Sequence, residues 1–512
     1  MGSCFQCGNK DIIFNENYAK LDVEINPFIS SEQYRNIDTK ADTFHSSLKN
    51  KKTLKIGKGD FVRIRGDNFF DEYELKEKLG EGAYGSVYKV YQKTTNYIRA
   101  VKAIKKKSVY KNEFMNEMEV LKTVDHPNII KVFDCYYDHL FYYMVEEYCS
   151  GGDLFDYIKK EKCFTERKAS IIFKQLLSAI NYLHKKNIVH RDLKPDNIVF
   201  IKTKNNNIFI KLIDFGTSTA FKGKKLSQEF GTIYYIAPEV IMNNYNEKAD
   251  IWSCGIILYT MLCGHPPFCG SDENAIKAKI LHSKLNFPTK DFKNISDEAV
   301  EFIKLLLAYN PEKRPSAEEA LQNSWLSNES NCSNIKLNEE IISNLTKFKT
   351  TLGLQKLTIS FLTNQISINE EIKTLKEEFD KFDVNKDGEI SKEELIECLK
   401  VCYPHKEAIK RAERIFNEID FNDDGKINFS EFLIANFKKE KLLSEETLEK
   451  TFKLFDLDGN GFITLDELKE FMPIEITSKL EWRELISEVD KDGDNQISLN
   501  EFKEMMENLI NN

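Results

Sequence analysis

The sequence predicts a multidomain protein in which an α+β front region is followed by an all-α C-terminal region. Three observations predict this fold class: strand-like segments with glycine-rich turns occupy residues 74–106, a mostly helical stretch follows, and an acidic 12-residue pattern then recurs four times. The length of 512 residues also exceeds what one hydrophobic core usually organises. We therefore expect several domains.

Composition and charge exclude some classes of protein. Hydrophobic residues make up 41% of the chain, and the longest strongly apolar stretch, residues 254–263, is too short to span a bilayer. No secretory signal is recognisable, so we expect the 11 cysteines to be free thiols in the reducing cytoplasm. Residues 371–512 carry 21 Lys and Arg against 36 Asp and Glu, a net charge of −15, whereas the whole chain carries −9. This imbalance favours cation binding or a contact between the two halves, and argues against nucleic-acid binding.

The first predicted turn of the front region contains three glycines, in the sequence GEGAYGSV at residues 80–87. Glycines let backbone N–H groups approach phosphate oxygens, although a plain glycine-rich hairpin is an equal alternative. The next features favour phosphate binding. Lys102 lies on the third predicted strand and Glu117 on the amphipathic segment 109–124, and a lysine held by a carboxylate can grip nucleotide phosphates.

A second group of polar residues follows in HRDLKPDN (190–197) and in the Asp-Phe-Gly sequence at 214–216. Phosphoryl transfer requires a group that accepts the substrate hydroxyl's proton, a cation on the migrating phosphoryl group, and oxygen ligands for magnesium. Asp192 and Lys194 fit the first two roles, and Asn197 with Asp214 fits the third. The predicted catalytic residues are therefore Asp192, Lys194, Asn197, Asp214, Lys102 and Glu117.

With these motifs, residues 73–325 resemble a eukaryotic protein kinase. The resemblance implies a bilobal α+β fold, with a β-rich N-lobe and a mainly helical C-lobe, and ATP and Mg²⁺ as cofactors. Lys194, two residues after Asp192, resembles the lysine that serine/threonine kinases have at this position. Asp153 and Asp196 resemble positions that accept basic side chains of protein substrates near the target Ser or Thr. The ATP-binding residues implied are Gly80, Glu81, Gly82, Ala83, Gly85, Val87, Lys102 and Glu147.

Intact Lys102, Asp192 and Asp214 favour an active enzyme over a pseudokinase scaffold. Two further positions need interpretation. Glu146 aligns with the position that guards the back of the adenine pocket, where such kinases usually have an uncharged residue. Glu229 offers a standing negative charge to Arg191, which would make phosphorylation of the activation segment unnecessary. Phosphorylation sites remain an alternative there, at Thr217, Ser218, Thr219 and Ser227.

The four acidic repeats are loop 1 (383–394), loop 2 (420–431), loop 3 (456–467) and loop 4 (490–501). Calcium takes oxygen ligands from positions 1, 3, 5, 7 and 12 of such a loop, with a bidentate glutamate at position 12. A single match to this pattern could be an acidic loop that is merely exposed to solvent. Four matches at regular spacing make that alternative negligible. The predicted ligands are Asp383, Asn385, Asp387, Glu389, Glu394; Asp420, Asn422, Asp424, Lys426, Glu431; Asp456, Asp458, Asn460, Phe462, Glu467; and Asp490, Asp492, Asp494, Gln496, Glu501.

Two other loop positions carry structural expectations. Position 6 needs a positive φ, and it is glycine in loops 1 to 3 but Asn495 in loop 4, a residue type that tolerates this conformation. Position 8 is isoleucine in every loop, so we expect short strands that join the loops in pairs. The loops could sense calcium or be saturated at all times, because the same ligands serve both.

The whole chain resembles the calcium-dependent protein kinases of plants and protists, in which a calmodulin-like domain with four EF-hands follows the kinase. The domains expected are an extension (1–70), the kinase (71–326), a junction (327–370) and the calmodulin-like domain (371–512). Residues 336–368 suggest one basic amphipathic helix, which calmodulin-like domains bind. A helix that only links the two domains is the alternative. The resemblance implies instead that this segment inhibits the kinase and that calcium relieves the inhibition.

The N-terminal sequence MGSCFQC makes Gly2 a candidate for myristoylation and Cys4 and Cys7 candidates for palmitoylation. Gln6 departs from the acylation pattern, which wants Ser or Thr at that position. Two lipid chains would hold a cytoplasmic protein stably on a membrane. Residues up to 68 show little periodicity, so we expect a partly disordered extension, and we expect the protein to be a monomer.

Overall fold

The computed structural model describes residues 55–511, except 67, 83–84, 108–110, 203–207, 222–224, 328–337, 351, 366–369, 439–442 and 472–478. Gly2, Cys4, Cys7 and Ala83 lie outside the described residues, so acylation and the Ala83 nucleotide contact stay predictions. No described helix has the length and apolarity that crossing a membrane would require.

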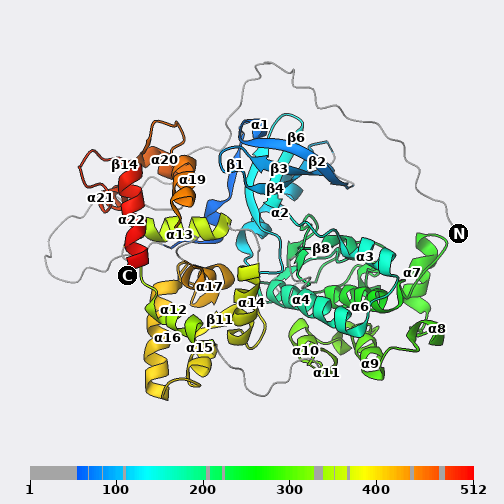
Figure 1. Ribbon diagram of the computed structural model, residues 1–512. Coiled ribbons are helices and arrows are strands. Elements are labelled where there is room, and N and C mark those ends of the chain that lie inside the picture. Colours follow the sequence, from blue (N-terminus) through cyan, green and yellow to red (C-terminus); the bar gives the residue numbers. More distant parts are fainter. Residues whose placement is uncertain are drawn as a thin grey trace, which may run out of the picture. The chain divides into compact units, whose positions relative to one another are not determined.

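The N-terminal lobe is built on a six-stranded sheet with the order β1-β5-β6-β4-β3-β2 (Figure 1). The three strands expected in residues 74–106 are present as β2, β3 and β4. All neighbours are antiparallel except β1 and β5, and helix α2 (Lys111–Thr123) follows β4. The strands are β1 (Arg63–Arg65), β2 (Tyr73–Glu81), β3 (Gly85–Gln92), β4 (Ile98–Lys105), β5 (Val132–Tyr137) and β6 (Phe141–Glu147).

The second lobe is mainly helical, which confirms the expected bilobal fold. Helix α6 has buried residues all round, and a buried ion pair joins Arg314 to Glu239, with Arg314 Nη2 2.8 Å from Glu239 Oε2. The helices are α3 (Leu154–Glu161), α4 (Glu166–Lys185), α5 (Pro238–Ile241), α6 (Lys248–Cys263), α7 (Glu273–His282), α8 (Thr289–Phe292), α9 (Asp297–Leu306), α10 (Ala317–Leu321) and α11 (Ser324–Ser327). The short strands are β7 (Ile188–Val189), β8 (Ile198–Phe200), β9 (Ile210–Leu212) and β10 (Thr219–Ala220).

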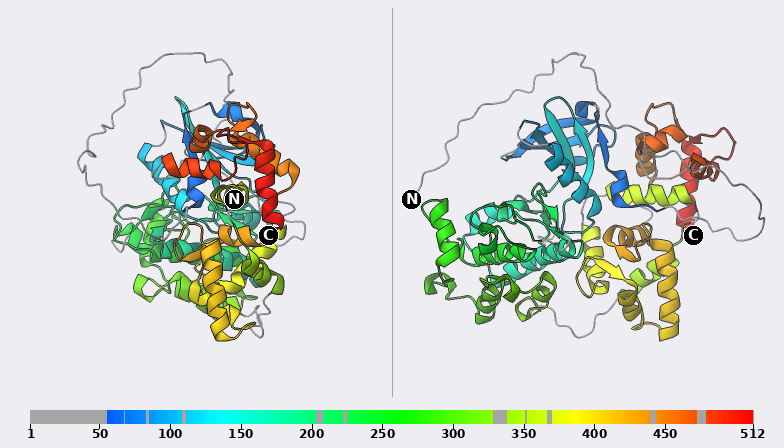
Figure 2. Two further views of the ribbon diagram at one scale, coloured as in Figure 1. Left: turned by 90° about the vertical axis from the view of Figure 1, so that its left-hand side faces the viewer. Right: turned by 180° about the vertical axis from the view of Figure 1, so that it is seen from behind.

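In the C-terminal region a helix lies on each side of every loop. Figure 2 shows this region, coloured yellow to red, from two further directions. Strand β11 (Glu389–Ser391) pairs with β12 (Lys426–Asn428), and β13 (Phe462–Ile463) pairs with β14 (Ile497–Ser498). The position 8 isoleucines face each other in both pairs, as predicted. The helices are α14 (Glu370–Phe382), α15 (Lys392–Leu399), α16 (His405–Ile419), α17 (Phe429–Asn436), α19 (Glu445–Phe455), α20 (Leu465–Phe471), α21 (Lys479–Ser487) and α22 (Leu499–Asn511).

The junction differs from the single helix predicted for residues 336–368. It forms two helices, α12 (Glu339–Lys347) and α13 (Gly353–Gln365). Helix α12 ends where Phe348 turns to an extended ψ of 132°, and its side chain is buried among those of the C-terminal region. Gly353, a poor helix former, begins α13. The prediction of one continuous helix was wrong: Phe348 fits the predicted apolar pattern, but the backbone leaves the helical conformation at this residue.

Residues 55–66, within the extension that was expected to be partly disordered, are ordered. They form a short 3₁₀ helix, Lys58–Phe61, followed by β1. Ile56 and Phe61 are buried in the core of the C-terminal region, and the Phe61 ring lies 5.8 Å from that of Phe361 on α13. Isolated apolar residues of this kind leave no periodic pattern in a sequence, so only the tertiary contacts reveal the order.

Phe61→Ala tests this packing. Removing a buried phenylalanine costs about 3–5 kcal/mol of folding free energy through lost transfer energy and the cavity left behind. We expect urea denaturation, followed by circular dichroism, to show the C-terminal region unfolding at a lower urea concentration. Phe155→Ala is the control, because Phe155 is 46% exposed on α3. Equal midpoints for the two variants would contradict the packing of Phe61.

Candidate active site and calcium loops

Lys102 on β4 forms the first group of the candidate active site. Its Nζ lies 2.8 Å from Glu117 Oε1 on α2 and 2.9 Å from Asp214 Oδ1. Glu117 is only 4% exposed, so its carboxylate has few competing water contacts. The structure therefore brings together three of the predicted catalytic residues, from three separate parts of the chain.

The Asp214 carboxyl group is ionised at neutral pH. Burial alone would raise its pKa, but the nearby Lys102 ammonium outweighs that effect and lowers the pKa to about 2. For Lys102, burial works against the charged form, while Glu117 and Asp214 raise the pKa above its ordinary value. Asp214 has a φ of +64°, which turns its side chain toward Lys102 before Phe215 enters the core.

Asp192, Lys194 and Asn197 form the second group. Lys194 Nζ lies 2.7 Å from Asp192 Oδ2, and Thr232 Oγ1 donates to Asp192 Oδ1 at 2.9 Å. Asn197 Nδ2 donates to the Asp192 carbonyl at 2.8 Å, so Asn197 Oδ1 is the atom that this side chain can offer to a metal. Asp192 is thus oriented from both sides, as a group that accepts a substrate proton must be.

Asp250 on α6 holds the chain segment that carries Asp192. Its Oδ2 accepts from the His190 backbone N–H at 2.9 Å, and its Oδ1 accepts from that of Arg191 at 3.0 Å. His184 Nε2 lies 2.9 Å from the same carboxylate. These contacts compensate a buried charge and fix the backbone where Arg191 has a φ of +72°.

The glycine-rich segment joins β2 to β3. A side chain on Gly85 would approach Ala103 O to 1.9 Å, so the hairpin requires glycine there. Around Gly80 there is open space, with nothing within 4 Å of an added Cβ. Val87 pairs with Lys102 across the sheet, while Glu81 forms an exposed ion pair with Lys78.

Glu146 and Glu147 end β6 and have different environments. The Glu147 carboxylate forms an ion pair with buried Lys211 at 2.8 Å, which leaves only its main chain for a nucleotide. Burial raises the pKa of Glu146 to about 8, although the Lys102 charge opposes this shift. At neutral pH Glu146 is therefore mostly a neutral acid, which reconciles a glutamate with a position that is usually uncharged.

The expected contact between Glu229 and Arg191 is wrong. Glu229 Oε1 lies 2.6 Å from Lys277 Nζ on α7, whereas the Arg191 guanidinium lies over the Phe230 ring, 4.2 Å from its centre. Arg191 Nε also donates to the Thr217 carbonyl. The sequence supplied both charges, but the observed partner of Glu229 comes from helix α7.

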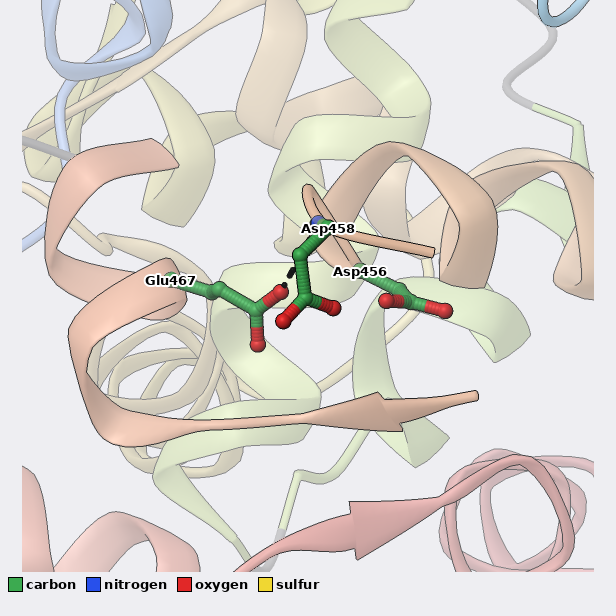
Figure 3. Close-up of side chains that lie close together, drawn as sticks. All are labelled: Asp456, Asp458 and Glu467. Atoms are coloured by element: carbon green, nitrogen blue, oxygen red, sulfur yellow. Dashed lines mark hydrogen bonds between the residues drawn. The ribbon is translucent and has the colours of Figure 1, made fainter. Parts of the chain in front are cut away.

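The oxygen atoms of loop 3 and loop 4 converge as a calcium site requires. Side-chain oxygens of Asp456, Asp458 and Glu467 lie within 4.8 Å of one another, as Figure 3 shows for the side chains. Asp490 and Asp492 form a similar group with Asp494. Hard oxygen donors gathered in this way suit a calcium ion, which would supply the positive charge that relieves their mutual repulsion.

Each loop is preorganised by its own hydrogen bonds. In loop 1 the Glu394 carboxylate accepts from the Val384 backbone at 3.0 Å, and Asp383 accepts from the backbones of Asp387 and Gly388. The position 6 residue has a positive φ in all four loops, including 62° at Asn495, as predicted. The predicted ligands at positions 1, 3 and 5 lie in the turn of each loop, and the position 12 glutamate lies in the first turn of the helix that follows. Their ligand roles stay predictions.

Loop 1 also contacts the kinase-like region, which sequence reasoning missed. Asn181 Nδ2 on α4 donates to the Lys386 carbonyl at 2.9 Å, and Lys186 Nζ lies 2.5 Å from Glu389 Oε1. A side chain on Gly388 would approach His126 to 2.6 Å. No sequence motif marks such contacts, because α4 and loop 1 lie about 200 positions apart in the chain.

Glu146→Gln tests the buried carboxyl. Its pKa is about 8 in the folded protein, against an ordinary value of 4.5. Between these values the folded protein keeps a proton that the unfolded chain has lost, so the free energy of unfolding falls as pH rises. We expect calorimetry at fixed free calcium to show a larger loss of melting temperature from about pH 5.5 to pH 8 in the wild type than in the variant. Equal losses would mean that Glu146 is ionised when folded.

Comparison with known proteins matches both regions. The protein kinase domain model matches residues 73–326, and the EF-hand domain pair model matches residues 372–436 and 445–507. Calcium-dependent protein kinase 4 of Plasmodium falciparum (isolate 3D7) is 39% identical over 477 residues, which cover 89% of this chain and 90% of that protein. Calcium-dependent protein kinase 5 of the same organism is 36% identical over 441 residues, covering 84% and 77% of the two chains.

A third relative, calcium-dependent protein kinase 3 of Plasmodium berghei (strain Anka), is 35% identical over 476 residues, covering 90% of this chain and 85% of that protein. These alignments run through the kinase domain, the junction and the EF-hand region together. Combined with the intact catalytic residues, they establish a serine/threonine kinase that uses ATP and responds to calcium. The chain belongs to the calcium-dependent protein kinase family.

Proposed function

We propose that calcium controls this kinase through the position of junction helix α13. When the EF-hand loops are filled, their helices enclose α13 and the active site is free. When the loops are empty, the junction leaves that enclosure and obstructs the active site. The observation that carries this proposal is the burial of α13 among the EF-hand helices.

Helix α13 packs against α17, α21 and α22, so it contacts both EF-hand pairs. Leu354, Leu357 and Phe361 are at most 3% exposed. The Phe361 ring contacts those of Phe455 and Phe471 of the second pair, with centroids 5.3 and 5.1 Å apart. Enclosing an apolar helix in this way is how calmodulin-like domains bind their targets.

The same helix also buries polar groups without compensation. Among the described residues, the side-chain polar atoms of Thr358, Ser360, Thr363 and Asn364 have no hydrogen-bond partner. Each such group costs about 1–3 kcal/mol in the enclosed position. The enclosure therefore needs an additional stabilising contribution, and filled calcium loops that hold the EF-hand helices in place would supply it.

The end of α13 is also attached to the N-terminal lobe. Arg99 on β4 donates through Nη2 to the Gln365 carbonyl at 3.0 Å and to Gln365 Oε1 at 2.9 Å. The Arg99 guanidinium lies over the Phe133 ring, 3.8 Å from its centre. This contact lies on the strand that carries Lys102, which supports the proposal that the position of α13 affects catalysis.

Truncation after residue 326 tests the proposal. The shortened kinase lacks the junction and the EF-hands, so we expect it to phosphorylate a peptide at a rate that does not change with free calcium. The full chain should be nearly inactive without calcium and rise to a comparable rate with it. The measurement is peptide phosphorylation titrated against buffered free calcium.

Two outcomes would contradict the proposal. A truncated kinase that stays inactive while the full chain responds to calcium would show that the C-terminal region activates the kinase directly, without relief of obstruction. Activity of the full chain that is constant at all calcium concentrations would favour EF-hands that serve only as permanent structural elements.

We also propose that the kinase prefers basic residues near the target Ser or Thr. Asp153 caps α3, and its pKa is raised by burial and by the negative charge of Asp196 nearby. Two neighbouring carboxylates suit an arginine side chain. We expect an Arg-to-Ala peptide to lose at least about tenfold in kcat/KM. Asp196→Asn should reduce that difference, and equal rates for both peptides with the wild type would sink the idea.

A further inference from the structure

A cavity of about 390 Å³ lies between α4 of the kinase domain and α14 of the first EF-hand. Its α4 wall includes Lys174 and Gln175, and its α14 wall includes Lys373 and Lys376. Lys386 of loop 1 also lines it. Cavities of this volume accommodate small molecules.

The charges around the cavity are mostly positive. Lys174, Lys373, Lys376, Lys381 and Lys386 line it together with two carboxylates, Glu377 and Asp380. Asp380 is already engaged, because its Oδ2 lies 2.6 Å from Lys376 Nζ and its carbonyl accepts from Lys386. Lys381 is paired with Glu378 at 2.7 Å. The available carboxylates therefore do not balance the lysines.

Among these residues, Lys373 gives the clearest indication of an anion site. It is 6% exposed, and among the described residues its Nζ has no hydrogen-bond partner. Lys174, across the cavity on α4, likewise has no ion pair in the described part of the chain. A buried ammonium without a partner is costly, so a native site of this kind is expected to receive an anion.

Neutral polar side chains that line the cavity already donate their hydrogen bonds to backbone carbonyls, so they do not bind that anion. Gln175 Nε2 donates to the carbonyls of Ile171 and Ile208, and Ser170 Oγ donates to the Arg167 carbonyl. Ammonium groups are thus the donors that remain, and lysines bind phosphate as point charges without demanding a planar partner.

We propose that this cavity binds a small soluble molecule that carries phosphate groups, held by Lys373 from α14 and Lys174 from α4. Because the two lysines belong to the EF-hand region and the kinase domain, the ligand joins them. The neighbouring contacts of Asn181 with Lys386 and of Lys186 with Glu389 are part of the same interface. Binding therefore stabilises the docking of the first EF-hand on α4.

The test uses the full chain at saturating buffered calcium and constant ionic strength, with the ATP site filled by a non-hydrolysable analogue. Inositol trisphosphate is titrated and binding is measured by calorimetry. We expect one site. Lys373→Met and Lys174→Met should each weaken binding at least about tenfold, the size of one charged contact. Lys410→Met is the control, since Lys410 is an exposed lysine on α16 and should change the affinity less than about twofold.

Melting temperatures of all variants, measured without the ligand, separate loss of the site from loss of the fold. A variant that melts like the wild type and binds weakly supports the site. Two results overturn the proposal: absence of binding to the wild type at millimolar inositol trisphosphate, or equal affinities in the wild type and in folded Lys373→Met.

Discussion

The ion pairs of Lys102 hold the active arrangement of this kinase together. One ammonium group on β4 contacts Glu117 on α2 and Asp214 beside the helical lobe, so the sheet, the helix and the second lobe meet at a single charge. That charge keeps Asp214 ionised despite its burial. It also lies close enough to Glu146 to oppose the rise in that residue's pKa. Moving the Lys102 ammonium away would therefore raise the pKa of both Asp214 and Glu146.

The kinase motifs and the calcium loops could be recognised in the sequence because each motif is short, whereas the meeting of Lys102, Glu117 and Asp214 depends on the fold. A calcium loop needs its oxygens within 12 residues, and its turn needs glycine or, as Asn495 shows, a residue that tolerates positive φ. Glu229 illustrates where such reasoning fails. Its partner Lys277 lies on another helix, and no spacing rule connects them. The order in residues 55–66 and the break at Phe348 likewise depend on tertiary packing that leaves no periodic pattern.

The EF-hand region is connected to the kinase domain at separate places. The end of α13 contacts Arg99 on the sheet, and loop 1 contacts α4 of the helical lobe. In loop 1 burial raises the pKa of Asp383, its predicted first ligand, to about 7. Loop 1 thus contacts the helical lobe directly, at a place separate from the junction.

The uncompensated polar groups of α13 have a physical meaning in this arrangement. A helix that only had to stay enclosed would be more stable with apolar residues at Thr358 and Asn364, because burying such groups unpaired costs free energy. For a helix that must also leave the enclosure, this cost is useful, because it reduces the free-energy difference between the enclosed and the released positions. In the proposed switch, the free energy of calcium binding then needs to exceed only a small difference between the two positions.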